Sequence, residues 1–241
     1  LMKEVQQRIA DSRVLDLIES FLKQQILEDL KLWTPETGSP QGAVISPLLS
    51  NIYLHEVDKA MKMAGYEMIR YADDFVILCK NQPEAEAALA RVTELVQERG
   101  LTLHADKTSL VDTQQAGQSF DFLGYHFEKG TRWPRKKSLK KFKDTIRRKT
   151  KRSNGYSIAD IIDDINKTSE GWFEYFKHSH WHTFKPLDGW IRRRIRSILR
   201  GYSKGKGISR GRDNSRWPNK YFQDLGYFSL YDAHRSLLQS S

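Results

Sequence analysis

One stretch decides the fold of the first half of the chain: EMIRYADDFVILC, residues 67–79. Two short runs rich in β-branched and aromatic residues, 67–71 and 75–79, flank the polar pair Asp73 and Asp74. This pattern predicts a β-hairpin with a tight turn. The turn brings two carboxylates close together, and carboxylate oxygens are hard ligands suited to Mg²⁺. Because Asp-Asp also favours turns through side-chain to backbone hydrogen bonds, the dipeptide alone indicates either a metal site or an ordinary turn.

Helical patterns lie on both sides of this hairpin. Residues 1–25 repeat apolar residues at helical spacing, and Asp11-Ser12 begins a second helix within them. Ser46-Pro47 has the form of an N-cap followed by proline at the first helical position, and predicts a helix to about Met63. The remaining pattern predicts a helix over 83–99 that ends at Gly100, short strands within 101–127, and basic helices over 138–151, 157–177 and 186–202.

Charge is distributed unevenly along the chain. Residues 1–128 carry 12 Lys and Arg against 20 Asp and Glu, whereas residues 129–241 carry 28 against 10. Five of the six tryptophans also lie in the basic part. Because Lys and Arg neutralise phosphates and aromatic rings stack on unpaired bases, this part is expected to bind nucleic acid. A solvated basic surface around ordinary core tryptophans is the alternative.

Length and composition exclude several classes of protein. A chain of 241 residues with 39% hydrophobic content can bury a sizeable core and is not a disordered tail. The single cysteine, Cys79, excludes a disulfide framework and a cysteine-based zinc module. No apolar stretch approaches 18 residues and no secretory signal pattern is visible, so we expect no membrane association and a cytoplasmic location.

Several motifs, in order along the chain, resemble those of one protein family. Tyr71-Ala72-Asp73-Asp74 between two apolar strands resembles the signature hairpin of reverse transcriptases. The stretch GSPQGAVISPLLSNIYL, residues 38–54, resembles the Pro-Gln-Gly loop and helix of the same family, in the form most similar to group II intron reverse transcriptases, also called maturases. Further blocks with such a resemblance are Leu101–Leu103 with Asp106–Thr108, Phe122–Tyr125, Gly171–Phe176, Leu187–Arg194 and Arg216–Phe222.

The resemblance implies a fold and a reaction. The implied fold class is α+β: a truncated right-hand polymerase palm, an antiparallel sheet with helices, over residues 1–128, followed by an all-α thumb or maturase (X) domain over residues 129–241. The implied reaction is RNA-directed DNA polymerisation by two-metal nucleotidyl transfer, with Mg²⁺ or Mn²⁺ as the metal and a deoxynucleoside triphosphate (dNTP) as substrate. The implied partners are intron RNA and an RNA template with its DNA primer.

The resemblance also assigns catalytic and nucleotide-binding roles. Asp73 would be a Mg²⁺ ligand, with Asp74 as its neighbour in the catalytic metal site. Gln41 and Gly42 would line the template and nucleotide pocket, where backbone without a side chain can approach a base pair closely. Lys107 would face the incoming triphosphate or the pyrophosphate, either as a charge clamp or as a proton donor. A plain turn for the Gln-Gly pair and a solvated lysine are the alternatives.

Primer and RNA contacts are implied for the later part of the chain. Leu123 and Gly124 would support the primer end, with ordinary core positions in a strand as the alternative. Clusters of Lys and Arg on two predicted helices would track phosphates without reading sequence. The candidates for nucleic-acid binding are Lys136, Lys137, Lys140, Lys141, Arg147, Arg148, Lys149, Arg192, Arg193, Arg194 and Arg196.

One part of the family pattern is missing from the chain. The family carries a further catalytic aspartate on a strand before the helix that opens this sequence, whereas Asp11, Asp16 and Asp29 lie within or after that helix. A two-metal site without this carboxylate should bind Mg²⁺ poorly, so we expect the chain alone to be inactive. A complementing N-terminal segment or a second chain would complete the site. A truncated palm would also expose a sheet edge, which predicts a dimer or an exchanged element.

Two other interpretations stay open. His178, His180 and His182 alternate, but they follow a helix, where alternation does not gather three imidazoles; surface or RNA-facing histidines are therefore favoured over a zinc site. The alternative to the polymerase is an RNA-binding splicing cofactor, a maturase that clamps intron RNA without polymerisation. The intact Asp73-Asp74 pair favours the polymerase, because a pure binding protein has no need of it.

Overall fold

The computed structural model describes residues 1–23, 26–28, 31–33, 44–153, 155–205 and 207–239. The chain forms two compact units, residues 1–110 and 111–241. This division falls before the predicted boundary at residue 128, because the strands that precede residue 128 pack with helices of the second unit. Among the described residues, the first unit has two clusters of buried apolar side chains and the second unit has one.

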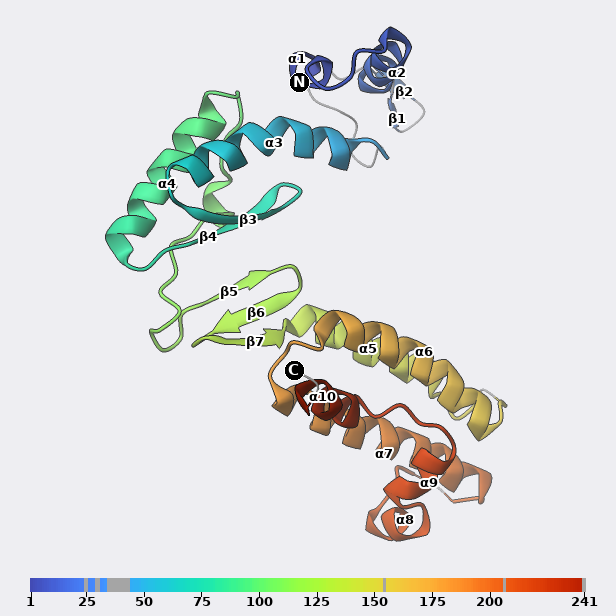
Figure 1. The fold of residues 1–241 in the computed structure, drawn as a ribbon. Coiled ribbons are helices and arrows are strands. Elements are labelled where there is room, and N and C mark those ends of the chain that lie inside the picture. The colour runs from blue at the N-terminus through green and yellow to red at the C-terminus, as the bar shows by residue number, and fades with distance from the viewer. Residues whose placement is uncertain (24–25, 29–30, 34–43, 154, 206, 240–241) are drawn as a thin grey trace. The chain divides into compact units, whose positions relative to one another are not determined.

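The first unit combines helices with short antiparallel hairpins. Its elements are α1 (Met2–Gln6), α2 (Ser12–Leu22), β1 (Ile26–Glu28), β2 (Lys31–Trp33), α3 (Ser46–Met63), β3 (Glu67–Tyr71), β4 (Asp74–Leu78), α4 (Gln82–Gln97) and the 3-10 helix η1 (Ala105–Lys107). Helices α3 and α4 lie along the β3–β4 hairpin, and α1 and α2 pack on α3 (Figure 1). The two predicted helices within residues 1–25 are thus confirmed, as are the hairpin and the helices on either side of it.

The β3–β4 hairpin is antiparallel, with Tyr71 opposite Asp74 and Met68 opposite Ile77. Alternate residues of a strand point to opposite faces, so one face of the hairpin packs on the helices and the other carries exposed side chains. Burial of the inner face anchors the hairpin to α3 and α4, and so fixes the base from which the turn projects. The apolar cluster under it comprises Val57, Met61, Ala88, Val92, Leu95 and Val96, with Met68, Phe75 and Ile77 of the hairpin packed against them.

Local capping explains where the helices of this unit begin. The Asn81 side chain accepts a hydrogen bond from the Glu84 N–H at 2.9 Å and caps α4. The Asp11 carboxylate accepts one from the Arg13 N–H at 2.8 Å and caps α2. The prediction for α3 was wrong by one residue: Ile45 is the N-cap, and Ser46 already belongs to the helix.

The second unit is a three-stranded sheet followed by helices. Its elements are β5 (Ser119–Phe122), β6 (Tyr125–Glu128), β7 (Thr131–Pro134), α5 (Lys136–Lys149), α6 (Ile158–Phe176), the 3-10 helix η2 (Trp181–Thr183), α7 (Phe184–Tyr202), α8 (Gly211–Arg216), α9 (Asn219–Asp224) and α10 (Leu230–Gln239). The sheet is antiparallel in the order β5-β6-β7. Helix α5 lies beside α6, and α10 lies on α7 (Figure 1). The three predicted basic helices are confirmed as α5, α6 and α7, and no described helix has the length and apolar character to cross a bilayer.

The prediction of strands throughout residues 101–127 holds only for its last part. Within this range the described strands begin at Ser119, and the segment before them contains η1 and turns. Side chains there satisfy backbone groups locally: the side-chain amide oxygen of Gln118 accepts from the Asp112 N–H at 2.8 Å, and the Asp112 carboxylate accepts from the Gln114 N–H at 3.0 Å. Such bonds offer the backbone an alternative to a strand partner.

Candidate functional site

The Asp73-Asp74 pair lies at the tip of the β3–β4 hairpin. Ala72 and Asp73 form a two-residue turn between the paired residues Tyr71 and Asp74. Ala72 has a φ of 55°, in the left-handed region that residues with a Cβ adopt rarely. Both aspartates are exposed, and within the described residues neither carboxylate has a hydrogen-bond partner or a paired cation. The turn therefore presents two carboxylates to an external ligand.

The chemistry of these donors fits a magnesium ion. Mg²⁺ is bound in proteins by one or two carboxylates together with substrate phosphates, and Asp73 and Asp74 supply two carboxylates. The described residues hold no group of three or more His, Cys, Asp or Glu side chains that could bind a metal. Nucleic-acid, triphosphate or further protein oxygens would have to complete the coordination.

Of the three residues predicted to contact nucleotide, the structure places one. Gln41 and Gly42 lie outside the described residues. Lys107 is the last residue of η1 and its side chain is exposed. Its contact with a triphosphate stays a prediction, consistent with a head group that is open to solvent.

Leu123 and Gly124 form the turn between β5 and β6. Both have positive φ, 47° and 81°, so the interpretation as ordinary strand residues was wrong. The turn is held by its carbonyls: the Tyr175 hydroxyl donates to the Leu123 carbonyl at 2.7 Å, and the Arg135 N–H donates to the Gly124 carbonyl at 2.9 Å. A Cβ on Gly124 would lie 3.4 Å from the Ser138 hydroxyl oxygen, so a side chain there would have little room.

This turn borders a groove of about 460 Å³ between α5 and α6, which we call the α5–α6 groove. Trp172, Tyr175 and Phe176 supply apolar surface, and Lys141 adds a positive charge. The groove thus combines apolar surface with one positive charge. The remaining lining residues are Leu123, Gly124, Ser138, Phe142, Thr145, Thr168 and Gly171.

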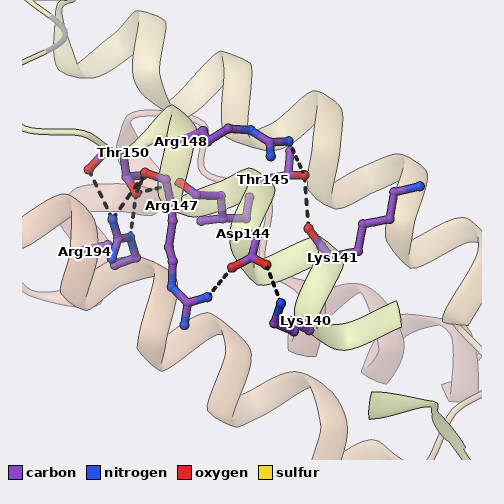
Figure 2. Close-up of polar contacts among 9 residues, drawn as sticks. Lys140, Lys141, Asp144, Thr145, Arg147, Arg148, Thr150 and Arg194 are labelled. Carbon is purple, nitrogen blue, oxygen red and sulfur yellow. Dashed lines mark hydrogen bonds and ion pairs between the residues drawn. The ribbon is translucent and has the colours of Figure 1, made fainter. Parts of the chain in front are cut away.

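Six exposed cations lie on α5, and we call them the α5 surface: Lys136, Lys137, Lys140, Lys141, Arg147 and Arg148. Asp144 lies among them; it bonds Arg147 at 2.5 Å and pairs with Lys140 at 3.7 Å. Figure 2 shows both contacts. These contacts are on an exposed face and are weak in water. The surface can therefore exchange them for phosphates. Lys149 is more enclosed and pairs with Asp164 of α6 at 2.5 Å.

The arginines of helix α7 have different surroundings, and Arg194 and Arg196 bond to other parts of the same unit. Arg194 donates to the Thr150 hydroxyl at 2.6 Å and so closes the end of α5 (Figure 2). Arg196 is only 6% exposed and donates to the Trp217 carbonyl at 2.8 Å and to Asn219 at 2.9 Å. Both guanidiniums thus hold the fold together. The prediction that they bind nucleic acid is weakened, because exchange for a phosphate would break these internal bonds.

Arg192 and Arg193 instead line a cleft between α7 and the α8–α9 segment. The cleft has a volume of about 770 Å³, and we call it the arginine cleft. Arg210, Asn214 and Asn219 also line it, and the edge of Arg196 reaches it. Sequence reasoning does not identify Arg210, Asn214 or Asn219, because their Gly/Ser/Arg-rich surroundings have no apolar period that would place them beside α7.

The histidine triplet forms no metal site among the described residues. The His180 ring lies against Trp133 in a tilted arrangement with ring centroids 4.5 Å apart, and the backbone N–H of His180 donates to the Arg132 carbonyl at 2.8 Å. His178 and His182 are exposed. Two of the three are thus surface histidines, as predicted, whereas His180 is half-buried against Trp133.

Two family models match the chain. The reverse transcriptase (RNA-dependent DNA polymerase) model matches residues 1–127, and the group II intron, maturase-specific domain model matches residues 139–217. The first match ends next to the predicted domain boundary at 128, and the second covers most of α5, α6, α7 and α8.

Curated relatives point in the same direction. The chain is 48% identical over 52 residues to the group II intron-encoded protein LtrA of Lactococcus lactis subsp. cremoris, which is 22% of this chain and 9% of that protein. It is 31% identical over 160 residues to protein YkfC of Escherichia coli, 52% of this chain and 41% of that protein. It is 23% identical over 269 aligned positions to a putative COX1/OXI3 intron 1 protein of Saccharomyces cerevisiae, 86% of this chain and 32% of that protein. The chain thus spans less than half the length of these relatives.

Proposed function

Since the chain belongs to the reverse transcriptase family, in the group II intron-encoded branch with a maturase domain, we propose that the full-length protein copies RNA into DNA and binds intron RNA. The first unit would contribute part of a right-hand polymerase palm, and the helical unit would serve as thumb and maturase domain. The observation that carries the polymerase proposal is the turn with two exposed aspartates lacking an internal partner among the described residues.

Asp73 and Asp74 would hold Mg²⁺, or Mn²⁺ in its place. The metal, when bound, would activate the attacking primer hydroxyl and neutralise charge on the dNTP phosphates. Lys107 would add a positive charge beside the triphosphate. The Leu123-Gly124 turn and the α5–α6 groove would hold the primer end, because the turn is rigid and the groove offers apolar surface with Lys141 at its side.

Primer extension on an RNA template tests this proposal. With Mg²⁺ and dNTPs, the full-length protein is expected to extend the primer, whereas residues 1–241 alone are expected to be inactive because a third catalytic carboxylate is missing. Extension by residues 1–241 alone would mean that another carboxylate of the chain completes the site. No extension by the full-length protein, with intron RNA still bound, would overturn the polymerase proposal.

The second candidate function is RNA binding without polymerisation, as a splicing cofactor. The observation that favours it is the amount of preformed basic surface in the helical unit: the α5 surface and the arginine cleft. Such contacts would position structured RNA through its backbone rather than its bases. Both functions can reside in one protein, so they are tested separately.

Charge removal on these surfaces is expected to weaken intron RNA binding. Lys137→Ala with Lys141→Ala, or Arg193→Ala with Arg210→Ala, should each lower affinity about tenfold at low salt, because each variant loses two phosphate contacts. The slope of log affinity against log salt should fall by about one to two. Filter binding over a salt series measures both quantities.

The matched control removes two exposed lysines that are paired with acids elsewhere in the same unit. Lys167 pairs with Asp163 at 2.7 Å and Lys220 pairs with Asp224 at 3.1 Å. The variant Lys167→Ala with Lys220→Ala should leave affinity and slope within about twofold of wild type. Equal losses in control and test variants would mean that net charge alone, and not these surfaces, binds the RNA.

A further inference from the structure

Arg70 makes a set of contacts that joins the aspartate turn to helix α3. Its side chain is 10% exposed, on the face of β3 that packs on the helices. Nε and Nη2 donate to the two oxygens of Asp58, at 2.8 and 2.6 Å. Nη1 donates to the Asn51 side chain at 2.8 Å and to the carbonyl of Ala72 at 2.7 Å. One guanidinium therefore donates to four oxygens of three residues, two on α3 and one in the β3–β4 turn.

The bond to Ala72 acts directly on the position of Asp73. The carbonyl of Ala72 and the N–H of Asp73 belong to one planar peptide group, so holding the carbonyl orients the peptide that leads into the aspartate pair. Ala72 stands at φ 55°, a conformation that an alanine keeps only when its surroundings impose it. Arg70 supplies such a restraint.

The helix that receives the other bonds also follows the predicted nucleotide loop. α3 begins at Ser46, four positions after Gly42 in the sequence, and Asn51 and Asp58 both lie on it. The hydrogen bonds to the Asp58 carboxylate raise the pKa of the Arg70 guanidinium above its ordinary value, so Arg70 stays charged. The planar fork of arginine matches a carboxylate with two parallel bonds and leaves Nη1 for the other acceptors, which a lysine cannot do.

We infer that Arg70 is a positioning residue: with Asp58 and Asn51 it sets the Asp73-Asp74 turn relative to α3, and so fixes the carboxylates for metal binding. The inference rests on the proposed polymerase function. Mg²⁺ demands near-ideal octahedral geometry, and a displacement of about 1 Å in a reacting group can cost about 100-fold in rate. Small movements of this turn should therefore appear in metal binding and turnover before they appear in global stability.

The test compares two arginines of the first unit, both in the full-length protein. Arg70→Lys keeps the charge and removes the fork. Arg99→Lys is the matched control, because Arg99 also holds two parts of the unit together, donating to Glu4 at 2.5 Å and to the Tyr53 carbonyl at 2.9 Å. Its contacts join α1 and α3 and involve no residue of the turn. Three quantities are measured for each variant: single-nucleotide incorporation with Mg²⁺ and with Mn²⁺, Mn²⁺ affinity by electron paramagnetic resonance, and the thermal midpoint.

Arg70→Lys is expected to lower kcat with Mg²⁺ about 30-fold with the KM for dNTP within about threefold, and to weaken Mn²⁺ binding about fivefold. Activity with Mn²⁺ should fall less than activity with Mg²⁺, because the smaller ion is the stricter about geometry. Arg99→Lys should leave the ratio of Mn²⁺ to Mg²⁺ activity and the Mn²⁺ affinity within about twofold of wild type, whatever its thermal midpoint. Wild-type Mn²⁺ affinity in Arg70→Lys, or losses that follow the thermal midpoint equally in both variants, would overturn the inference.

Two further cases are covered, an inactive wild type and an Arg70→Lys variant that does not fold. If wild type extends no primer, the proposed function fails, and the Mn²⁺ affinities still decide on Arg70. If Arg70→Lys does not fold, Asn51→Ala replaces it, since this change on an exposed helix position removes one acceptor of Nη1 and keeps the Asp58 pair. It should weaken Mn²⁺ binding about twofold to threefold, and an unchanged affinity would overturn the inference.

Discussion

Replacing Asp73 with alanine in the full-length protein is expected to reduce primer extension by about 1,000-fold or more, equivalent to about 4 kcal/mol of transition-state stabilisation. The reason is electrostatic: the change removes one of the two carboxylates that the turn offers to a metal. Because Asp73 is exposed and without an internal partner among the described residues, the fold should be unaffected. Primer extension under single-turnover conditions measures the rate, and circular dichroism with thermal unfolding checks the fold.

Glu67→Ala is the matched control for this prediction. Glu67 is an exposed carboxylate on the same hairpin, at the opposite end of β3 from the turn, and its loss should change the rate by less than about twofold. Intron RNA affinity should stay at the wild-type value in Asp73→Ala, because the basic surfaces lie in the other unit. A variant Asp73→Ala that retains its rate would mean that the aspartate pair only stabilises a turn.

The elements around the turn could be predicted because their signals are local. Alternation in β3 and β4 and the helical period of α3, α4 and α5 are each contained in fewer than 20 consecutive residues, and the structure has them within a few positions. The position of the Asp73-Asp74 pair could be predicted for the same reason, since a two-residue turn is determined by the residues of the turn and of the two strands beside it. Leu123-Gly124 could be singled out only by resemblance, and its turn geometry could not be foreseen.

Roles that depend on distant partners could not be predicted. Arg70 looks like an ordinary strand residue until Asp58 and Asn51 are brought to it by the packing of α3. Helix α7 carries five arginines, and nothing in that run distinguishes Arg194, Arg196 and Arg200, which form internal bonds, from those that only line the cleft. Tertiary context decides this, because one turn of the helix separates a side chain that lines the cleft from a buried one.

Asp188 is another residue whose role depends on distant partners, and its removal should destabilise the helical unit strongly. It is fully buried on α7 and accepts four hydrogen bonds, from the Tyr227 and Ser229 hydroxyls, both at 2.9 Å, and from the backbone N–H groups of Leu230 and Tyr231 at 3.1 and 2.8 Å. The two N–H groups belong to the first turn of α10, so the carboxylate caps that helix from another part of the chain. Burial and the negative charge of Asp188 raise the pKa of the Tyr227 hydroxyl well above its ordinary value, which keeps it a donor.

Asp188→Ala leaves these donors buried without an acceptor, and unsatisfied buried groups cost about 1–3 kcal/mol each. We expect the free energy of unfolding of the helical unit to fall by about 3 kcal/mol or more. Urea unfolding of residues 1–241, followed by tryptophan fluorescence, measures the loss, because five of the six tryptophans lie in this unit. Asp188→Asn should cost less, because the amide oxygen still accepts while the NH₂ group meets a donor.

Asp163→Ala serves as the control for Asp188. Asp163 lies on α6 with a side chain that is 67% exposed and paired with Lys167, so its loss should change stability by less than about 0.5 kcal/mol. A loss in Asp188→Ala no larger than that of the control would mean that water replaces the carboxylate in the packed interior. A large loss would instead show that the stability of the second unit depends on this buried carboxylate. Asp188 would then join α10 to α7, the helix whose arginines line the arginine cleft.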